Sequence, residues 1–232
     1  MILAEVETHL SRPIAPTRRV ALGDLQLPCE PAPGFGGILL GGIVARFGPE
    51  LDLDLQEDLL RLMRDVELGR RIPQPRLRHR LQDDRVGLQR SRHRLLGVGE
   101  GLRFELDEER GTPAQHVLCA VYAAATTAPS VRHTVIATLR KGLYWRGGSD
   151  AELVAHLSGH AAPLGVDALA DPVAWALRTL ALSDGVGTPS RREVQRAFRA
   201  RLRAEHPDHG ADDHGAGDRI ARLAAARRIL LG

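Results

Sequence analysis

The side chains best suited to chemistry form the tripeptide His206-Pro207-Asp208 and a row of arginines that precedes it. The arginines are spaced four, three and four residues apart, at Arg192, Arg196, Arg199 and Arg203. This spacing places the arginine row on one face of a helix, where it produces a positive potential that attracts an acidic surface. A carboxylate after the proline can accept a charge-assisted hydrogen bond from an arginine of a partner. Taken singly, the row is also typical of a solvated helix face, and the tripeptide of an ordinary turn.

The residues around the tripeptide predict a helix on each side of it. Ser190 and Glu193 form a capping box that begins the first helix, and Pro207 ends this helix near Glu205. Its apolar stripe consists of Val194, Ala197, Phe198 and Leu202. The second helix follows a Gly/Asp-rich loop segment and is predicted to be capped by Asp218. Its apolar positions are Ile220, Leu223, Ala226 and Leu230. A shorter helix is predicted upstream, beginning at Asp171-Pro172.

This arrangement resembles a J domain, the module of the DnaJ-type co-chaperones, over residues 171–232. Ala197-Phe198-Arg199 stands where the family usually has Ala-Tyr-Arg, and the His-Pro-Asp tripeptide follows in the frame of the family. The sequence departs from the family at Arg227, which replaces an aromatic residue, and no fourth helix follows. The loop between the upstream helix, which begins at Asp171-Pro172, and the helix that begins at Ser190 is also a few residues longer than usual in the family.

The resemblance implies a partner and a mechanism. In this family, the His-Pro-Asp loop and the basic face of the preceding helix dock on a DnaK-type heat-shock chaperone and stimulate its ATP hydrolysis. His206, Pro207 and Asp208 would then be the trigger, and the arginine row would supply the docking cations. The chain itself would be no enzyme and would need no cofactor. Because it has neither a Cys-x-x-Cys-x-Gly-x-Gly repeat nor a long Gly/Phe-rich tract, a specialised co-chaperone is expected rather than a general-purpose one.

The composition is that of a folded protein, with 43% hydrophobic and 26% charged residues and a formal net charge of +3. Lys141 is the only lysine, and such a predominance of arginine is typical of a GC-rich bacterial coding sequence. The first residues do not have the basic and apolar segments of a signal peptide, and no apolar run reaches membrane-spanning length. Cys29 and Cys119 form no disulfide framework. We therefore expect a cytoplasmic protein without a membrane segment.

The motifs of enzymes are incomplete in this sequence. The glycines of residues 34–42 match neither the dinucleotide-binding nor the phosphate-loop pattern, and close backbone packing is the better explanation of Gly41 and Gly42. Cys119 lies in an apolar segment, as an inert core residue does. Histidines and aspartates gather between residues 206 and 218, but they lack the rigid spacing of metal ligands. We therefore expect neither catalysis nor a metal site.

Residues 1–165 are predicted to form a separate domain. Helices are predicted over residues 54–69, 112–127, 131–145 and 149–160, and a β-hairpin over residues 92–98 and 102–106, with its turn at residues 99–101. The first twenty or so residues are predicted to be irregular, with a short strand near the start, and residues 38–47 to be a buried strand or helix. The expected fold class is α+β, mostly helical with a small antiparallel sheet or hairpin. A linker over residues 159–169 then leads into the all-α J-domain-like helical hairpin.

Residues 70–96 are the most basic stretch of this domain and suggest another function. The candidate contact residues are Arg76, Arg78, Arg80, Arg90, Arg92 and Arg94. Arginines on alternate residues of a strand would form one cationic face that contacts the phosphates of a nucleic acid, or else an acidic client or the chaperone. The aromatic residues with which single-strand binders stack on bases are missing, so a solvated, ion-paired surface is the favoured interpretation.

Two hypotheses follow from the sequence. In the first, the J-domain-like module recruits a DnaK-type chaperone to a client or a location that residues 1–165 select. In the alternative, the chain is a nucleic-acid-associated protein that uses the arginines of residues 70–96, and the J-like helices are a scaffold.

Overall fold

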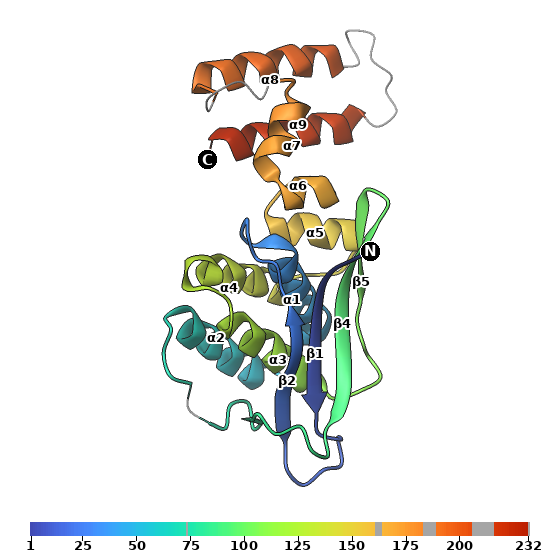
Figure 1. Ribbon diagram of the computed structural model, residues 1–232, viewed down its shortest axis with the longest axis vertical. Coiled ribbons are helices and arrows are strands. Elements are labelled where there is room, and N and C mark those ends of the chain that lie inside the picture. The colour runs from blue at the N-terminus through green and yellow to red at the C-terminus, as the bar shows by residue number, and fades with distance from the viewer. Residues whose placement is uncertain (73, 161–163, 183–188, 206–215, 232) are drawn as a thin grey trace. The chain divides into compact units, whose positions relative to one another are not determined.

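The computed structural model describes residues 1–232 except 73, 161–163, 183–188, 206–215 and 232 (Figure 1). The chain divides into two compact units, Met1–Ser158 and Gly159–Gly232, here called unit 1 and unit 2. The break between them coincides with the start of the linker that the sequence predicts.

Unit 1 contains a five-stranded sheet in the order β3-β2-β1-β4-β5. Its strands are β1 (Ile2–Leu10), β2 (Arg19–Gln26), β3 (Arg80–Leu81), β4 (Gln89–Val98) and β5 (Gly101–Glu105). Neighbouring strands are antiparallel except β2 and β3, which are parallel. The predicted hairpin is confirmed as β4 and β5. The prediction for the start of the chain was wrong, because β1 is nine residues long and lies in the middle of the sheet between β2 and β4.

The helices of unit 1 gather on one side of the sheet (Figure 1). They are α1 (Gly34–Phe47), α2 (Leu53–Glu67), α3 (Pro113–Ala125), α4 (Pro129–Leu143) and α5 (Asp150–Ser158), with the short 3-10 turn η1 (Gly48–Glu50) after α1. The four helices predicted over residues 54–160 are confirmed. Helix α1 contacts strands β1 and β4 as well as helices α3, α4 and α5. Its central position explains why residues 38–47 are apolar on all sides. Of the two structures expected for these residues, a buried strand or a buried helix, the helix is found.

Two glycines of α1 and one of α4 allow the elements of this core to approach closely. A Cβ atom on Gly142 would lie 2.3 Å from the carbonyl oxygen of Gly41, and one on Gly42 would lie 2.2 Å from the Phe104 ring. Any side chain at these positions would therefore push α1 away from α4 or from β5. The expected use of Gly41 and Gly42 in close packing is confirmed.

Side-chain caps fix where these helices begin. The Asp52 carboxylate accepts a hydrogen bond from the backbone N–H of Leu55 at 2.8 Å, at the start of α2. At the start of α5, the backbone N–H and the hydroxyl of Ser149 both donate to the Glu152 carboxylate, as in the predicted capping box. These bonds satisfy backbone donors that the first turn of a helix leaves without partners.

The described residues of unit 2 form the helices α6 (Val166–Ala170), α7 (Pro172–Thr179), α8 (Arg191–Glu205) and α9 (Ala216–Leu231). Helix α9 contacts both α7 and α8, and its Leu223 and Ala226 are buried. The Asp171 carboxylate caps α7, and Ser190 and Glu193 form the predicted box at α8. Within the described residues of both units, no helix is long and apolar enough to cross a membrane.

Two predictions for unit 2 were wrong. Residues 159–169 were expected to be a linker, but α6 occupies their end, where Ala168 and Leu169 are buried. Asp218 was expected to cap the last helix, but α9 begins at Ala216, so Asp218 lies in its first turn. There the carboxylate still interacts favourably with the positive end of the helix dipole. Together the two units make the chain a mixed α and β protein, as expected.

Candidate functional site

The arginine row lies on the solvent-exposed face of α8, as the sequence predicts. Arg192, Arg196, Arg199 and Arg203 are all exposed and line one surface hollow together with Gln195 and Ala200. None of the four forms an ion pair with another described residue. The carboxylate of Glu193, in the first turn, is held by the capping bonds from Ser190 at 2.6 and 2.7 Å. The guanidinium groups therefore face solvent as a cationic surface that is open to an acidic partner.

Two contacts with α9 orient α8. The Arg219 guanidinium donates to the carboxylate of Glu205 at 2.6 Å. The Arg227 guanidinium lies over the ring of Phe198, 5.1 Å from its centroid. Phe198 was expected in the core, but it is half-buried and covered by this cation, a contact that contributes about 0.5–1 kcal/mol at exposed sites. On the apolar side of α8, the Val194 side chain is fully buried.

The tripeptide His206-Pro207-Asp208 and most of the predicted loop after it lie outside the described residues. Glu205, the last residue of α8, is the last described residue before them. The histidines and aspartates considered as metal ligands fall mostly in the same segment, and the part of the chain that the structure describes holds no cluster suited to a metal ion.

The arginines of β4 lie on the face of the sheet turned away from the helices of unit 1, opposite the carboxylates of β1. Arg92 donates to Glu7 at 2.9 Å, and Arg90 lies 3.6 Å from the same carboxylate. Glu7 is 5% exposed. Burial opposes its ionisation, but the hydrogen bond from Arg92 and the charge of Arg90 hold its pKa below the ordinary value.

Arg94 completes this ion-paired face. Its guanidinium lies 2.6 Å from the carboxylate of Glu5 on β1 and 3.1 Å from that of Glu105 on β5. Carboxylates therefore neutralise much of the positive charge that the alternating arginines of β4 suggested. The geometry is that of the solvated, ion-paired surface that the sequence favoured.

The predicted cationic strand around Arg76, Arg78 and Arg80 was wrong. Leu77 and Arg78 have positive φ angles of 45° and 61°, so this segment is a tight turn, and β3 begins only at Arg80. A turn does not alternate its side chains between two faces as a strand does. Arg76 forms an ion pair with Asp65 on α2 at 2.9 Å, whereas Arg78 and Arg80 are exposed. The structure thus divides the six candidate arginines of unit 1 between separate elements.

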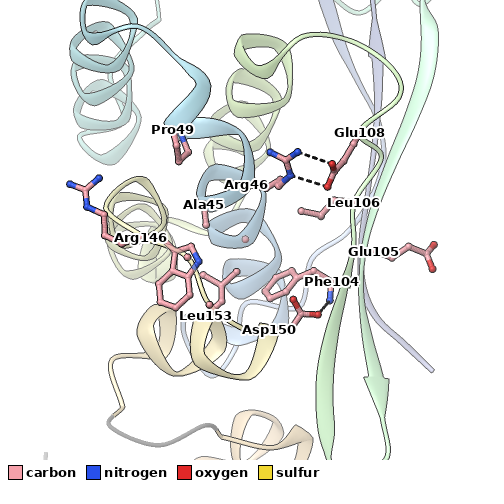
Figure 2. A pocket seen from close by; sticks show the side chains of 14 residues that line it. Ala45, Arg46, Pro49, Phe104, Glu105, Leu106, Glu108, Arg146, Asp150 and Leu153 are labelled. Carbon is pink, nitrogen blue, oxygen red and sulfur yellow. Dashed lines mark hydrogen bonds and ion pairs between the residues drawn. The ribbon is translucent and has the colours of Figure 1, made fainter.

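A hollow of about 740 Å³ in unit 1 lies between α1, β5 and the segment that joins α4 to α5 (Figure 2). Arg46 on its wall donates to Glu108 at 2.7 and 2.9 Å, and Asp150 accepts the backbone N–H of Phe104 at 3.0 Å. Its described lining contains no histidine, cysteine, serine or threonine. The hollow therefore offers apolar contact and charge, and its acid–base groups are the carboxylates of Glu105, Glu108 and Asp150, of which Glu108 is paired with Arg46. Sequence reasoning singled out none of these residues.

Sequence reasoning also missed a pair of buried histidines in unit 1. The backbone N–H of Asp107 donates to Nδ1 of His93, so Nε2 of His93 carries the proton and donates to Nδ1 of His116 at 3.0 Å. Phe47 stacks on His116 with centroids 4.2 Å apart. Burial lowers the pKa of both rings, that of His93 to about 3. The pair is therefore neutral near pH 7, and at 1% and 2% exposure it belongs to the core.

Both cysteines are free thiols inside the fold. Cys119 is fully buried in α3, and burial raises its pKa far above the ordinary value. Burial also raises the pKa of Cys29. Because the thiolate is the reactive form, neither side chain is suited to nucleophilic chemistry. The expectation that Cys119 is a core residue is confirmed.

Comparison of the chain with protein-family models, with curated proteins and with solved structures returned no match.

Proposed function

We propose that the chain is a specialised co-chaperone of the J-domain type. In this proposal, unit 2 recruits a DnaK-type heat-shock chaperone and stimulates its ATP hydrolysis, and unit 1 selects the client or the location. The observation that carries the proposal is the tripeptide His206-Pro207-Asp208 directly after a helix whose exposed face is the arginine row.

The contacts between α8 and α9 support this proposal. Glu205, at the end of α8, pairs with Arg219 near the start of α9, and Phe198, further back in α8, is covered by Arg227, further on in α9. Two helices with such contacts run in opposite directions, as in the helical hairpin of a J domain. Arg227 is the residue that departs from the family pattern, and its contact with the Phe198 ring offers a substitute for the packing of an aromatic pair.

The alternative, nucleic-acid binding by residues 70–96, gains no specific support. Glu5, Glu7 and Glu105 pair with the arginines of β4, and Asp65 pairs with Arg76. Contacts of these four arginines to the phosphates of a nucleic acid would first have to break these pairs, and of the six candidates only Arg78 and Arg80 form no ion pair with a described residue.

The proposal is tested by ATP turnover of a DnaK-type chaperone. Purified full-length protein is expected to accelerate steady-state hydrolysis by the chaperone in proportion to its concentration until saturation. It is expected to show no hydrolysis alone, because its sequence has no phosphate loop. Chaperone turnover that stays at its basal rate at saturating concentration would refute the proposal.

Reversal of the charge of Arg199 is expected to slow association with the chaperone. A cationic face accelerates encounter with an acidic surface, so Arg199→Glu should lower the association rate at low salt by roughly tenfold, and the Arg196→Glu/Arg199→Glu double variant by more. The difference from wild type should shrink at high salt, where charges are screened. Surface plasmon resonance over a salt series measures both effects.

Arg201→Glu provides the matched control for this experiment. Arg201 is also an exposed arginine of α8, but the helical period places it on the face opposite the arginine row. Its reversal changes the net charge equally and should leave the association rate nearly unchanged. If Arg199→Glu and Arg201→Glu have the same effect, the row is only a solvated face.

A further inference from the structure

A small pocket of about 210 Å³ lies where four segments of unit 1 meet: the loop between β1 and β2, the turn before β3, the start of α2 and the start of α3. Three arginines line it: Arg12 and Arg18 come from the loop between β1 and β2, and Arg78 comes from the turn before β3. All three are exposed, and none has a hydrogen-bond or ion-pair partner for its guanidinium within the described residues. No carboxylate appears in the described lining. The pocket thus gathers three positive charges without a counter-charge.

The framework of this pocket is fixed by a buried hydrogen-bond network. The side-chain amide of Gln115, which is 1% exposed, donates to the carbonyl and the hydroxyl of Ser11, both at 3.0 Å. Ser11 and Arg19 exchange two further bonds of 3.1 Å, which close the base of the loop that carries Arg12 and Arg18. The loop is therefore tied to the start of α3 before any ligand arrives, and this lowers the cost of ordering it on binding.

Two further groups at the pocket lack partners. The Ala114 backbone N–H, in the first turn of α3, has no acceptor within the described chain, and it stands at the positive end of the helix dipole. His79 is 4% exposed, and its Nδ1 lies 2.9 Å from the Leu77 carbonyl oxygen, whereas its Nε2 has no hydrogen-bond partner among the described residues. Burial lowers the pKa of His79, and the nearby charge of Arg18 lowers it further.

We propose that this pocket binds a phosphate group, as free inorganic phosphate or as the phosphate of a small monoester. Guanidinium groups bind phosphate oxygens through two parallel hydrogen bonds, and a helix start adds a backbone donor. The pocket accommodates the phosphate group itself, while its opening leaves the remainder of an ester in solvent. The site is independent of the proposed co-chaperone activity, since it uses residues of unit 1 alone.

The test is a titration of the full-length protein with inorganic phosphate at constant ionic strength, followed by isothermal calorimetry and by NMR of the histidine rings. Phosphate is expected to bind saturably at one site, whereas chloride is expected to show no saturable binding. Arg18→Gln and Arg78→Gln should each weaken binding by about tenfold or more, because each removes charge-assisted hydrogen bonds. Arg78→Lys keeps the charge but loses the planar fork, so an intermediate loss is expected. Bound phosphate should also raise the pKa of His79, because it offsets the charge of Arg18.

Arg103→Gln is the matched control, since Arg103 is an exposed arginine of β5 and lies outside the pocket lining. It should bind phosphate as wild type does. A parallel titration with glycerol phosphate distinguishes the sources: tighter binding than inorganic phosphate indicates a monoester, and equal binding indicates the free ion. The proposal is overturned if phosphate shows no saturable binding, or if Arg103→Gln weakens binding as much as Arg18→Gln and Arg78→Gln do.

Discussion

We expect Asp208→Asn to abolish stimulation of the chaperone's ATP hydrolysis while the melting temperature of the protein stays close to that of wild type. The carboxylate is the group that an arginine of the partner would bind, and asparagine removes its charge while keeping its shape. The sequence predicts that Asp208 follows the end of the helix at Pro207 and contributes to no core. Substitutions at such positions usually change stability by less than about 0.5 kcal/mol.

Single-turnover hydrolysis by the chaperone, paired with thermal melting of each variant, checks this expectation. His206→Gln should behave as Asp208→Asn does. Asp212→Asn, which removes a carboxylate of the same segment outside the tripeptide, is the matched control and should stimulate as wild type does. Retained stimulation by Asp208→Asn would show that the tripeptide is not a trigger. A large fall in its melting temperature would show that the residue holds the structure together instead.

The second large effect is expected on stability, which should fall steeply as the pH drops from 6.5 to 5. His93 and His116 are buried and neutral, with folded-state pKa values below that of the unfolded chain, where histidine titrates near pH 6.5. The unfolded state therefore binds protons that the folded state excludes. The stability from the pair is complete above pH 6.5 and is lost as the pH falls toward the folded-state pKa of His93, about 3.

The expected size of this loss follows from proton linkage. Each histidine contributes up to about 1.4 kcal/mol per pH unit, so His93, with a folded-state pKa of about 3, removes about 2 kcal/mol between pH 6.5 and 5, and His116 acts in the same direction. His9 and His79, whose pKa values are also lowered by burial, act in the same direction. Carboxylates such as Glu67, whose pKa is lowered by its hydrogen bond from Arg140, act in a lower window, as the pH falls below about 4.5.

Urea unfolding of the full chain at several pH values measures this loss. Glutamine at position 93 can accept a hydrogen bond from the Asp107 backbone N–H and donate one to His116 without titrating. His93→Gln should therefore reduce the slope of the unfolding free energy against pH by the contribution of one histidine. An equal slope for wild type and His93→Gln would contradict the account given for the pair.

Local patterns in the sequence predicted the helices well. Helices α2, α3, α5, α7 and α8 have apolar stripes at helical spacing and capping residues, signals that lie within a few residues of one another. Only a short strand was predicted where β1 runs over nine residues, and β2 was missed, although Glu5, Glu7 and His9 alternate with Val6, Thr8 and Leu10. Their stability depends on partners far away in the sequence, which propensity does not register. Around Arg78, the alternation of arginines indicated a strand, but two positive φ angles make a turn.

Among the candidate sites, too, the features set by neighbouring residues were predicted, and those that depend on distant residues were not. The helical period correctly placed the arginine row on the exposed face of α8, because period and exposure are local properties. The arginines of β4 were recognised, but their acidic partners on β1 lie 85 and 89 residues earlier in the sequence. The histidine pair and the arginine pocket were not predicted, since only the packing of α3 against the sheet and its loops assembles them.

The ion pairs between β1 and β4 also settle how these strands align. Arg92 and Glu7 are 85 residues apart, so no tight turn sets the register as it does in the β4–β5 hairpin. A shift of two residues would keep the same side chains toward the helices, but it would place Arg94 opposite the apolar start of β1 or Glu5 opposite Leu96. Each lost pair costs about 0.2–1 kcal/mol. The alternating charges thus favour the observed alignment of β1 and β4, and Glu5→Gln would weaken this preference by removing the partner that Arg92 and Arg94 share on β1.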